Sequence, residues 1–327
     1  MILVTGGAGF LGSHLVNELL NKDEEVRVLE QSGAQVDHLP LDRIDLVSAD
    51  IRDQAAVNKA TRNCSQVYHL AADPNLWRKD PQEFDKINHM GTVNVLRCAL
   101  ENGAEGIVHC STESILTSET FDGGSVENLT LKESDMLGPY CLSKFRAENA
   151  AFKMAAEGAP VLVVSPTLPV GPGDRRQTPP TRMSVAFCQG KLPAYLECQL
   201  NFIDVRDVAS GMTAVMKRGR TGIRYLLGGD NLRLSDWLQV LADETGQKVP
   251  RYKVPYSLAL AVAWFSECWA DNVDGKMPMA TMTGVRLTKR SMFFDPSASL
   301  SELEIQPRPI RESARDAVES YRQQGWI

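Results

Sequence analysis

A glycine-rich segment close to the first residue constrains the fold of this chain more than any other feature. The segment from Thr5 to Gly12 (TGGAGFLG) lies between an apolar run at 2–4 and leucines at 11, 15, 19 and 20, which recur at helical spacing. A second apolar run follows at 26–29. Strand, glycine turn, helix and strand in this order make a βαβ unit, whose glycine turn holds a pyrophosphate at the start of the helix. The segment therefore predicts a dinucleotide site.

Each glycine of this segment has its own task in such a unit. Gly6 permits the tight turn, Gly9 lets the backbone approach a pyrophosphate, and Gly12 lets the helix lie close to the strand. Without the flanking strand and helix, the same three glycines would indicate little.

Glu30 ends the second apolar run and bears on the choice of dinucleotide. A carboxylate at this place accepts hydrogen bonds from both adenosine ribose hydroxyls and repels a 2′-phosphate. Because Gln31 follows it, and not an arginine, we expect NAD rather than NADP. Two alternatives stay open: Glu30 is a solvated strand end, or Arg27 or Arg52 reaches the ribose.

Strand-like and helical segments alternate over the first half of the chain. Strand-like runs recur at 45–48, 67–70, 106–110 and 161–164, and helical patterns lie between them at 53–62, 82–102 and 140–157. This alternation is typical of an α/β fold with a doubly wound parallel sheet of Rossmann type, which binds ligands at the carboxyl ends of its strands. We therefore expect the chemistry just past those ends, at 50–51, 71–73, 111–113 and 165–167.

The alternation loosens beyond Gly171. Helical patterns continue at 181–189, 206–217, 234–245, 256–269 and 311–324, separated by loops and short strands. We expect a dinucleotide-binding domain over residues 1–170 and a smaller α+β substrate-binding lobe over 171–327, with some segments of the second part returning to the main sheet.

Tyr140 and Lys144 are the candidates for proton transfer. They stand four residues apart after the helix-starting pair Gly138-Pro139, which places both on one helical face. A neighbouring ammonium lowers the pKa of a tyrosine hydroxyl, and Thr112 or Ser111 at the end of a neighbouring strand could orient a substrate oxygen. By itself the YxxxK spacing is common by chance in surface helices. Its place after a nucleotide-binding unit favours catalysis.

Composition excludes several classes of function. The chain has 35 Lys and Arg against 41 Asp and Glu and no basic run longer than a pair, so we expect no nucleic-acid partner. Seven cysteines without a CxxC pair and five histidines without HExxH give no support for a metal site. No secretion signal opens the chain, and the uncharged stretch 254–266 is too short to span a bilayer. We therefore expect a soluble cytoplasmic protein without an integral membrane segment.

These features together resemble the extended short-chain dehydrogenase/reductase superfamily, which includes the NAD-dependent epimerase/dehydratase family. The matching segments follow the family's order over nearly the whole chain. They are the glycine segment from Thr5, Asp50–Asp53, His69–Ala72, Asn88–Asn94, Ser111-Thr112, the Tyr140/Lys144 pair and Gly171–Asp174.

A narrower resemblance is to the dihydroflavonol-reductase-like branch, and within it to bacterial hopanoid-associated sugar epimerases. It depends on six segments: Ala71–Asp73 with Leu76-Trp77, Met154–Gly158, Pro169–Pro172, Gly190–Tyr195, Tyr225–Asn231 and Met292–Phe294. This resemblance is stronger evidence for the fold and for the catalytic residues than for the identity of the substrate.

The resemblance assigns roles to individual residues. It places Gly6, Gly9, Phe10, Leu11 and Gly12 at the pyrophosphate, Glu30 at the ribose, Asp50 and Ile51 at the adenine edge, and Leu70, Ala71 and Ala72 at the middle of the cofactor. Tyr140 and Lys144 would bind the nicotinamide ribose as well as act with Thr112 on the substrate, and Pro166 and Thr167 would approach the nicotinamide amide. Asp73 and Trp77 would lie at the substrate.

Two departures from the family pattern, and one feature that counts against a sugar dehydratase, bear on the function. Thr112 stands where a second serine is usual and keeps the hydroxyl. Glu30-Gln31 replaces the Val-Arg usual in the branch, which shifts the expected cofactor towards NAD. Thr112 is followed by Glu113-Ser114, which supplies one carboxylate where a sugar dehydratase needs an acid and a base.

The helical pattern at 256–269 carries Leu258, Val262, Phe265 and Trp269 on one stripe, with Leu260 and Trp264 elsewhere on the helix. We expect a buried helix that packs the smaller lobe. The alternatives are an apolar wall of the pocket or a contact with a membrane surface for a lipid-like substrate.

Three functions are consistent with these observations. We favour an NAD-dependent oxidoreductase or epimerase acting on a secondary alcohol of a sugar or sugar conjugate, with Tyr140 as acid and base. The second is an NAD(P)-dependent dehydrogenase or reductase of a sterol, triterpenoid or other apolar hydroxyl or ketone. The third is a non-catalytic dinucleotide sensor, although such proteins tend to lose the tyrosine or the lysine. Homodimers are common in the family, so a homodimer is also expected.

Overall fold

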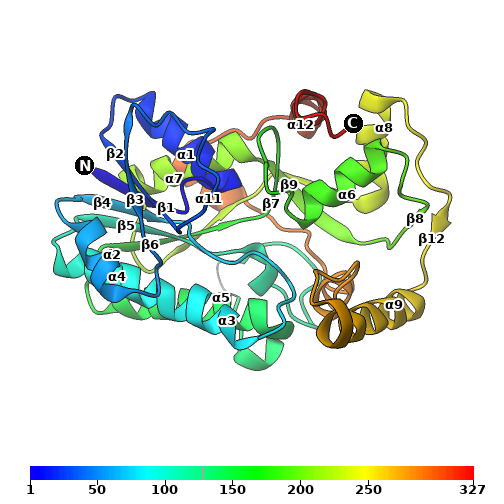
Figure 1. Cartoon of the computed structure of the whole chain (residues 1–327), viewed down its shortest axis with the longest axis horizontal. Coiled ribbons are helices and arrows are strands. Elements are labelled where there is room, and N and C mark those ends of the chain that lie inside the picture. Colours follow the sequence, from blue (N-terminus) through cyan, green and yellow to red (C-terminus); the bar gives the residue numbers. More distant parts are fainter. Residues whose placement is uncertain (127–128) are drawn as a thin grey trace.

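A seven-stranded parallel sheet forms the centre of the protein (Figure 1). The computed structural model describes residues 1–126 and 129–327. All neighbouring strands of this sheet run parallel. Their order is β10 (Arg224–Leu227), β6 (Val161–Pro166), β5 (Gly106–Cys110), β4 (Gln66–His69), β1 (Ile2–Thr5), β2 (Val26–Glu30) and β3 (Ile44–Ser48). The order reverses at β1, so the sheet is doubly wound and α/β, as predicted.

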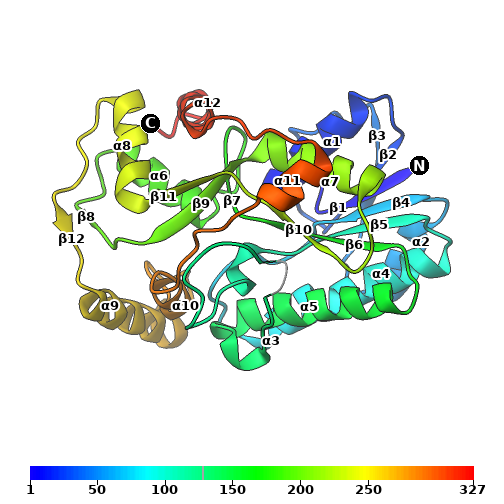
Figure 2. The same cartoon turned by 180° about the vertical axis from the view of Figure 1, so that it is seen from behind.

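Helices cover both faces of the sheet (Figures 1 and 2). One face carries α1 (Phe10–Leu20), α7 (Val205–Arg218) and α11 (Ser297–Leu303), and the other carries α2 (Gln54–Thr61), α4 (Gly91–Glu101) and α5 (Gly138–Ala156). Successive strand residues point to opposite faces. Ile2 and Val4 accordingly join the core under α1 and α7, while Leu3 joins the core under α2 and α4. This two-sided burial explains why the strands read as continuous apolar runs.

A continuous helical stretch from 82 to 101 contains a wider π-helical turn. It consists of α3 (Gln82–Phe84), the π-helix η1 (Asp85–Met90) and α4. Such π turns rotate the following residues relative to a regular helix and are frequent at functional sites. The turn places Asn88 in the interior, where it is fully buried.

The second half of the chain builds a smaller layer beyond the carboxyl ends of the main strands. Its sheet has the order β11 (Asp230–Arg233), β9 (Gln199–Asp204), β7 (Leu168–Val170), and a small pair joins β8 (Ala194–Tyr195) to β12 (Tyr252–Lys253). Helices α6 (Pro179–Cys188), α8 (Leu234–Thr245) and α12 (Ile310–Gln323) pack around Trp237 and Phe202. The remaining helical segments are α9 (Tyr256–Trp269), η4 (Ala270–Asp274), α10 (Met282–Leu287) and the short turns η2 (Glu113–Ile115) and η3 (Glu133–Asp135).

Segments from the second half of the chain, among them β10, α7 and α11, belong to the main sheet assembly. Strand β10 pairs with β6, and α7 packs on the same face as α1. The division into domains at residue 170 stays a prediction.

The expectation of a buried helix at 256–269 is wrong. Helix α9 forms with the predicted bounds, but its large side chains face outwards: Phe265 is 63% exposed and Trp269 is 51% exposed. The residues that face the protein are Ala259 and Ala263, which pack against Val285. Small alanine side chains let a helix approach its neighbour closely. The face with the alanines therefore packs inwards, and the large apolar side chains of α9 lie on the outside.

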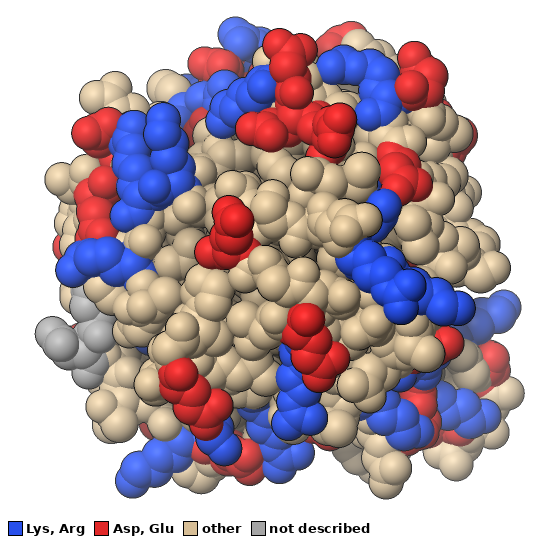
Figure 3. All heavy atoms as spheres, turned by 90° about the vertical axis from the view of Figure 1, so that its left-hand side faces the viewer, with Lys and Arg blue, Asp and Glu red and all other residues tan. Residues whose placement is uncertain are grey.

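Basic and acidic side chains are interspersed on the face at the left-hand side of Figure 1, where they lie mainly around its rim (Figure 3). Within the described part of the chain, no helix is long and apolar enough to cross a bilayer.

Candidate active site

The glycine segment forms the turn between β1 and α1. Gly6 has φ +73°, a conformation that favours glycine, and a Cβ on Gly12 would lie 2.1 Å from the carbonyl oxygen of Gly6. These positions therefore need glycine for the turn and for the close packing of the helix. Gly9 precedes α1 in an extended conformation. The turn leaves a cradle of backbone amides at the start of α1, where a pyrophosphate can bind.

All residues predicted to hold the cofactor line a single pocket of about 670 Å³. The pocket runs along the carboxyl ends of the strands, as expected for a doubly wound sheet. The residues in question are Gly6, Gly9, Phe10, Leu11, Gly12, Glu30, Asp50, Ile51, Leu70, Ala71, Ala72, Tyr140, Lys144, Pro166 and Thr167.

Glu30 is buried at the end of β2, which disfavours the solvated strand end. Its Oε1 accepts a hydrogen bond of 2.7 Å from the backbone N–H of Ala8 in the glycine turn. Its Oε2 lies 3.9 Å from a guanidinium nitrogen of Arg176. Sequence reasoning missed Arg176 because it arrives from the loop after β7, far from β2 along the chain. Arg27 bonds Asp45 and the carbonyl of Ala60 instead.

Asp50 and Ile51, which were predicted to lie at the adenine edge, both line the pocket. Asp50 pairs with Arg52, and this guanidinium lowers the pKa of the carboxyl despite the opposing effect of burial. Arg52 also pairs with Glu83 and lines the pocket itself, so the alternative that it reaches the ribose stays open. Ile51 is buried against α4, where a Cβ on Gly91 would come within 2.7 Å of it.

A buried network behind the strand ends supports the middle of the pocket. Thr5 Oγ1 lies 2.8 Å from His69 Nδ1 and accepts from the backbone N–H of Ala71 at 3.2 Å. Burial, with the nearby charge of Lys144, lowers the pKa of His69 to about 3, so the imidazole is neutral. The neutral ring connects Thr5 to Thr92 and fixes the backbone of Ala71 against the pocket.

Thr112, Tyr140 and Lys144 come together at the floor of the pocket and are all buried. The Lys144 ammonium donates a 2.7 Å hydrogen bond to the carbonyl oxygen of Cys110, and burial lowers its pKa. The pKa of Tyr140 is raised by burial and by the charge of Glu113, while a hydrogen bond with Thr112 acts in the opposite sense. The expected lowering of the tyrosine pKa by Lys144 is therefore not seen, because Lys144 is turned to Cys110. Tyr140 is a neutral hydroxyl at pH 7.

Glu113 lies in the segment 111–113 where the sequence predicted the chemistry, but it was given no role there beyond an argument against dehydration. It lines the pocket beside Thr112, whose Oγ1 donates to Glu113 Oε2 at 3.1 Å. Burial raises the pKa of Glu113 to about 7. The signal was its place directly after the β5 strand end, but the burial of the carboxyl depends on the packed fold.

Asn88 holds the pocket wall to the catalytic helix. Its amide accepts a 2.7 Å hydrogen bond from the backbone N–H of Asp73 and donates to the hydroxyl of Ser143 at 3.1 Å. Ser143 in turn donates to the carbonyl of Tyr140. The π-helical turn makes this placement possible, since it carries Asn88 into the interior.

The two predicted substrate residues of the β4 loop behave differently. Asp73 lines the pocket and pairs with Arg78. Trp77 does not line the pocket, so its assignment to the substrate is not supported. Its Nε1 donates a 3.1 Å hydrogen bond to Asp271 of η4, while its neighbours Leu76 and Arg78 face the pocket.

An apolar part of the pocket wall comes from the second half of the chain, beside the polar residues Arg182, Gln199 and Thr288. It includes Leu168, Pro169, Leu200, Leu287 and Met292, and Leu76 adds to it from the first half. Tyr140 packs in the same apolar cluster as Leu287 and Met292. Sequence reasoning missed this wall because its members are far apart along the chain.

The hydroxyls of Ser111 and Thr167 are buried at the strand ends without a hydrogen-bond partner in the described part of the chain. Both line the pocket, and the contact of Thr167 with the nicotinamide amide stays a prediction. Buried hydroxyls normally find partners, so these two are suited to bind a polar ligand. Together with the glycine cradle and Glu30, they fit a dinucleotide.

Comparison with known proteins agrees with this geometry. A family model described as "NAD dependent epimerase/dehydratase family" matches residues 2–228. A putative dihydroflavonol 4-reductase from Synechocystis is 33% identical, covering 99% of this chain and 95% of the relative. Sterol demethylase protein B from Methylococcus capsulatus is 28% identical, covering 99% of both.

Solved structures give the same picture. The crystal structure of gox2253 has a TM-score of 0.87 at 34% identity and covers 100% of this chain and 99% of its own. The structure of DesIV, a dTDP-glucose 4,6-dehydratase from Streptomyces venezuelae with NAD and TYD bound, has a TM-score of 0.81 at 26% identity and covers 99% and 98%.

Proposed function

Because this chain belongs to the NAD-dependent epimerase/dehydratase family of extended short-chain dehydrogenases/reductases, we propose that it transfers hydride between NAD and a secondary alcohol or ketone on an apolar ring system. The observation that carries this proposal is the position of the Tyr140 hydroxyl. It lies beside Thr112 on the floor of the pocket and within the same apolar cluster as Leu287 and Met292.

Different residues of the pocket would bind different parts of NAD. The amides of the glycine turn would bind the pyrophosphate, Glu30 the adenosine ribose, and Ile51 the adenine ring. Thr167 would bind the nicotinamide amide with its unpartnered hydroxyl. When bound, the nicotinamide ring supplies or accepts the hydride.

Tyr140 and Thr112 handle the proton. Since Tyr140 is neutral at pH 7, its hydroxyl is ready to donate to the oxygen of a ketone that is being reduced. The Thr112 hydroxyl is anchored by the N–H of Ser114 and by Glu113, and it would orient the same oxygen. Lys144 lines the same pocket with its ammonium hydrogen-bonded to the carbonyl of Cys110, and it would contact the cofactor there.

Two observations favour an apolar substrate over a sugar. The first is the wall formed by Leu76, Leu200, Leu287 and Met292. The second is that Sterol demethylase protein B, a relative of nearly the same length, carries a sterol activity in its name. The sequence-based preference for a sugar is therefore placed second.

The sugar conjugate remains the second candidate because of Arg182. This exposed arginine lines the pocket from α6 and has no ion-pair partner among the described residues, so it could bind the phosphate of a nucleotide sugar. The similarity to a dTDP-glucose dehydratase agrees with it. The resemblance to hopanoid-associated sugar epimerases, a cytoplasmic location and a homodimer all stay predictions.

A non-catalytic sensor is the least supported function. The relatives include named reductases and a dehydratase, and Thr112, Tyr140 and Lys144 are all present and together in the pocket. The protein is an enzyme.

Substitution of Tyr140 tests the proposal. Tyr140→Phe removes the proton path but leaves the ring that packs on Phe84, so turnover of a cyclic ketone should fall by at least about a thousandfold while NAD affinity changes little. Activity would be followed by NADH absorbance and affinity by calorimetry. Retention of most activity by this variant would show the mechanism to be wrong.

The identity of any bound dinucleotide distinguishes the two substrate classes. The purified protein would be denatured and the released nucleotide measured by mass spectrometry. An epimerase keeps NAD through its cycle, so near-stoichiometric NAD would favour the sugar conjugate. A protein that binds NAD only when it is added would favour a dehydrogenase or reductase, and hydroxylated sterols and triterpenoids would then be screened beside nucleotide sugars.

A further inference from the structure

Large apolar side chains are concentrated on one surface of the smaller lobe. Eight of the twelve large apolar side chains that are exposed among the described residues lie between Tyr252 and Met279. We define the α9 apolar face by the members on α9, η4 and the loop after them: Leu258, Trp264, Phe265, Trp269, Val273, Met277 and Met279. Monomeric soluble proteins rarely expose so many large apolar side chains together, so this face calls for a partner.

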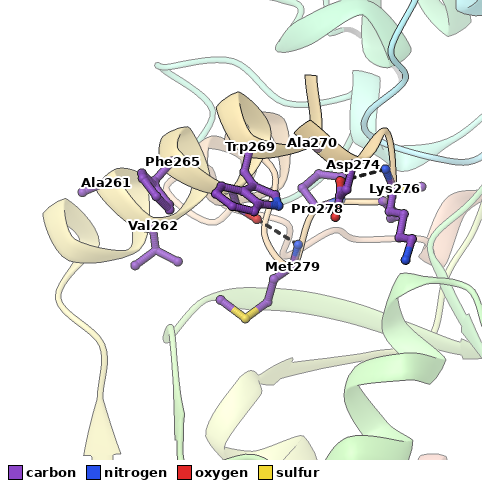
Figure 4. Close-up of a pocket in the computed structure, with 11 residues that line it drawn as sticks. Ala261, Val262, Phe265, Trp269, Ala270, Asp274, Lys276, Pro278 and Met279 are labelled. Atoms are coloured by element: carbon purple, nitrogen blue, oxygen red, sulfur yellow. Dashed lines mark hydrogen bonds between the residues drawn. The ribbon is translucent and has the colours of Figure 1, made fainter. Parts of the chain in front are cut away.

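The α9 apolar face also has a hollow. Val262, Phe265 and Trp269 from α9, with Pro278 and Met279 from the following loop, line a pocket of about 520 Å³ (Figure 4). The loop is held in place by a hydrogen bond of 2.9 Å from the Met279 N–H to Ser266 Oγ. The hollow is therefore a fixed feature of the surface, with room for part of an acyl chain.

Positive charge surrounds this face. Between Lys248 and Arg290 the chain carries seven Lys and Arg against three Asp and Glu, whereas the whole chain carries 35 against 41. Lys253 precedes α9, Lys289 lies 4.1 Å from the ring centroid of Tyr256 at the first turn, and Lys276 lines the hollow at the other end. The chain as a whole is acidic, but the segment that exposes its large apolar side chains is basic.

The three acidic side chains of this segment are engaged in hydrogen bonds within the protein. Glu267 accepts from the N–H of Met282, Asp271 accepts from Trp77, and Asp274 accepts from the N–H of Lys276. Of the cations, Lys253 pairs with Glu197, while Lys276 and Lys289 have no ion-pair partner among the described residues. These N–H donors leave the three carboxylates charged, but the seven cations of the segment outnumber them, so the net charge of the segment is positive.

We propose that the α9 apolar face docks on the surface of an anionic lipid bilayer, with Trp264, Phe265 and Trp269 in the headgroup region and the surrounding lysines at the lipid phosphates. Tryptophan and phenylalanine with flanking lysines are typical of protein segments that lie in the bilayer interface. Each lysine near an anionic surface adds to the attraction. The position of α9 on the outside of the smaller lobe leaves the face accessible (Figure 1).

Docking at this face would bring the substrate pocket to the bilayer. Helix α10 packs against α9, and its residues Gly284 and Leu287 line the substrate pocket. Trp77 ties η4 to the loop whose Leu76 and Arg78 line the same pocket. The docking surface stands independently of the proposed substrate, since no residue of the α9 apolar face belongs to the catalytic machinery.

Vesicle flotation of the full chain without substrate tests the proposal. The probes are vesicles of phosphatidylglycerol with phosphatidylcholine and vesicles of phosphatidylcholine alone. We expect binding to the anionic vesicles, weaker by about tenfold or more on the neutral ones. The triple variant Trp264→Ser, Phe265→Ser, Trp269→Ser should lose at least about tenfold in partitioning to anionic vesicles.

Two control variants separate the apolar and the charged parts. Leu41→Ser with Leu46→Ser removes exposed apolar side chains elsewhere on the molecule and should leave vesicle binding unchanged. Lys276→Gln with Lys289→Gln should reduce the preference for anionic vesicles. Circular dichroism checks that each variant folds, and since the substituted side chains are exposed, we expect unfolding temperatures close to that of the wild type.

Tryptophan fluorescence reports the depth of insertion. Brominated lipids should quench the wild type and quench far less in Trp264→Phe, Trp269→Phe, which keeps an apolar face and should still bind. Absence of binding to either vesicle would overturn the proposal. So would a wild-type dimer that the triple serine variant converts to a monomer without a change in vesicle binding, because the face would then join two copies of the chain. Neither result would affect the test of Tyr140.

Discussion

Glu113 is a carboxyl group held away from water beside the reacting groups. It is buried and accepts a hydrogen bond from the Thr112 hydroxyl, and burial raises its pKa to about 7. The folded protein therefore binds this proton more tightly than the unfolded chain, in which the pKa is close to 4.5. It follows that Glu113 destabilises the fold increasingly as the pH rises from about 4.5 to about 7.

Replacement of Glu113 by glutamine should remove this dependence on pH. We expect the free energy of unfolding of Glu113→Gln, relative to wild type, to rise between about pH 4.5 and pH 7 and to gain about 3 kcal/mol over that interval. Urea unfolding at several pH values measures it. Because the buried histidines contribute equally to both proteins, the difference isolates Glu113. A difference independent of pH would mean that the carboxyl ionises as freely as in water.

We expect Glu30 and Arg176 to determine the choice between NAD and NADP. Glu30→Gln keeps an oxygen that accepts from the N–H of Ala8 but removes the charge, which leaves Arg176 available to a 2′-phosphate. The ratio of kcat/KM for NADP over NAD should rise about tenfold, equivalent to about 1.4 kcal/mol. The double variant Glu30→Gln, Arg176→Gln should lose the gain. An unchanged ratio in the single variant would remove Glu30 from the ribose site.

At the scale of elements, the turn between β1 and α1 needs glycine at two positions for two different reasons. Gly12 is needed for packing, since a Cβ there would lie 2.1 Å from a backbone oxygen, whereas a Cβ on Gly9 would lie 3.1 Å from the same oxygen. Gly9 also has an ordinary φ of −74°. The fold therefore requires glycine at position 12, whereas we expect the ligand to require it at position 9.

Alanine substitutions should separate these two demands. Gly12→Ala should destabilise the protein by about 3 kcal/mol and abolish NAD binding, because α1 must move away from the turn. Gly9→Ala should cost about 1 kcal/mol or less but weaken NAD by at least about tenfold, since a methyl group would occupy the approach of the pyrophosphate. Thermal unfolding and calorimetry give the two quantities. Equal loss of stability in both variants would contradict the separation.

At the scale of the whole molecule, the main sheet is completed by a strand from the second half of the chain. Strand β10 carries Arg224, which bonds the buried Glu148 of α5 at 3.1 Å through its Nε. The ion pair therefore connects the returning segment to the helix that bears Tyr140 and Lys144. The same ion pair therefore supports both the main sheet and the helix that carries the catalytic residues.

Breaking this pair should be costly. Arg224→Met leaves a buried carboxylate unpaired and should destabilise the protein by about 3–5 kcal/mol, whereas Arg224→Met with Glu148→Gln should recover most of the loss. Denaturant unfolding of the two variants measures this. If the single variant lost less than about 1 kcal/mol, the pair would not support the sheet as we infer.

The sequence by itself determined the local features of this protein. The strands of the first half, the glycine turn, Glu30, and the Thr112, Tyr140 and Lys144 set follow from residues close together along the chain, where short-range periodicity and turn chemistry decide the structure. Those residues all line one pocket.

Only the tertiary structure decided which distant residues meet and which side of an element is buried. Arg176 reaches Glu30, Leu287 and Met292 face Tyr140, and Trp77 turns to Asp271 instead of the pocket. Helix α9 shows the limit most clearly, since its pattern is compatible with either face inwards. The alanines pack inside because they allow a closer approach to α10, and the large side chains were left on the surface. Burial depends on the neighbouring elements, and periodicity along one helix carries no information about them.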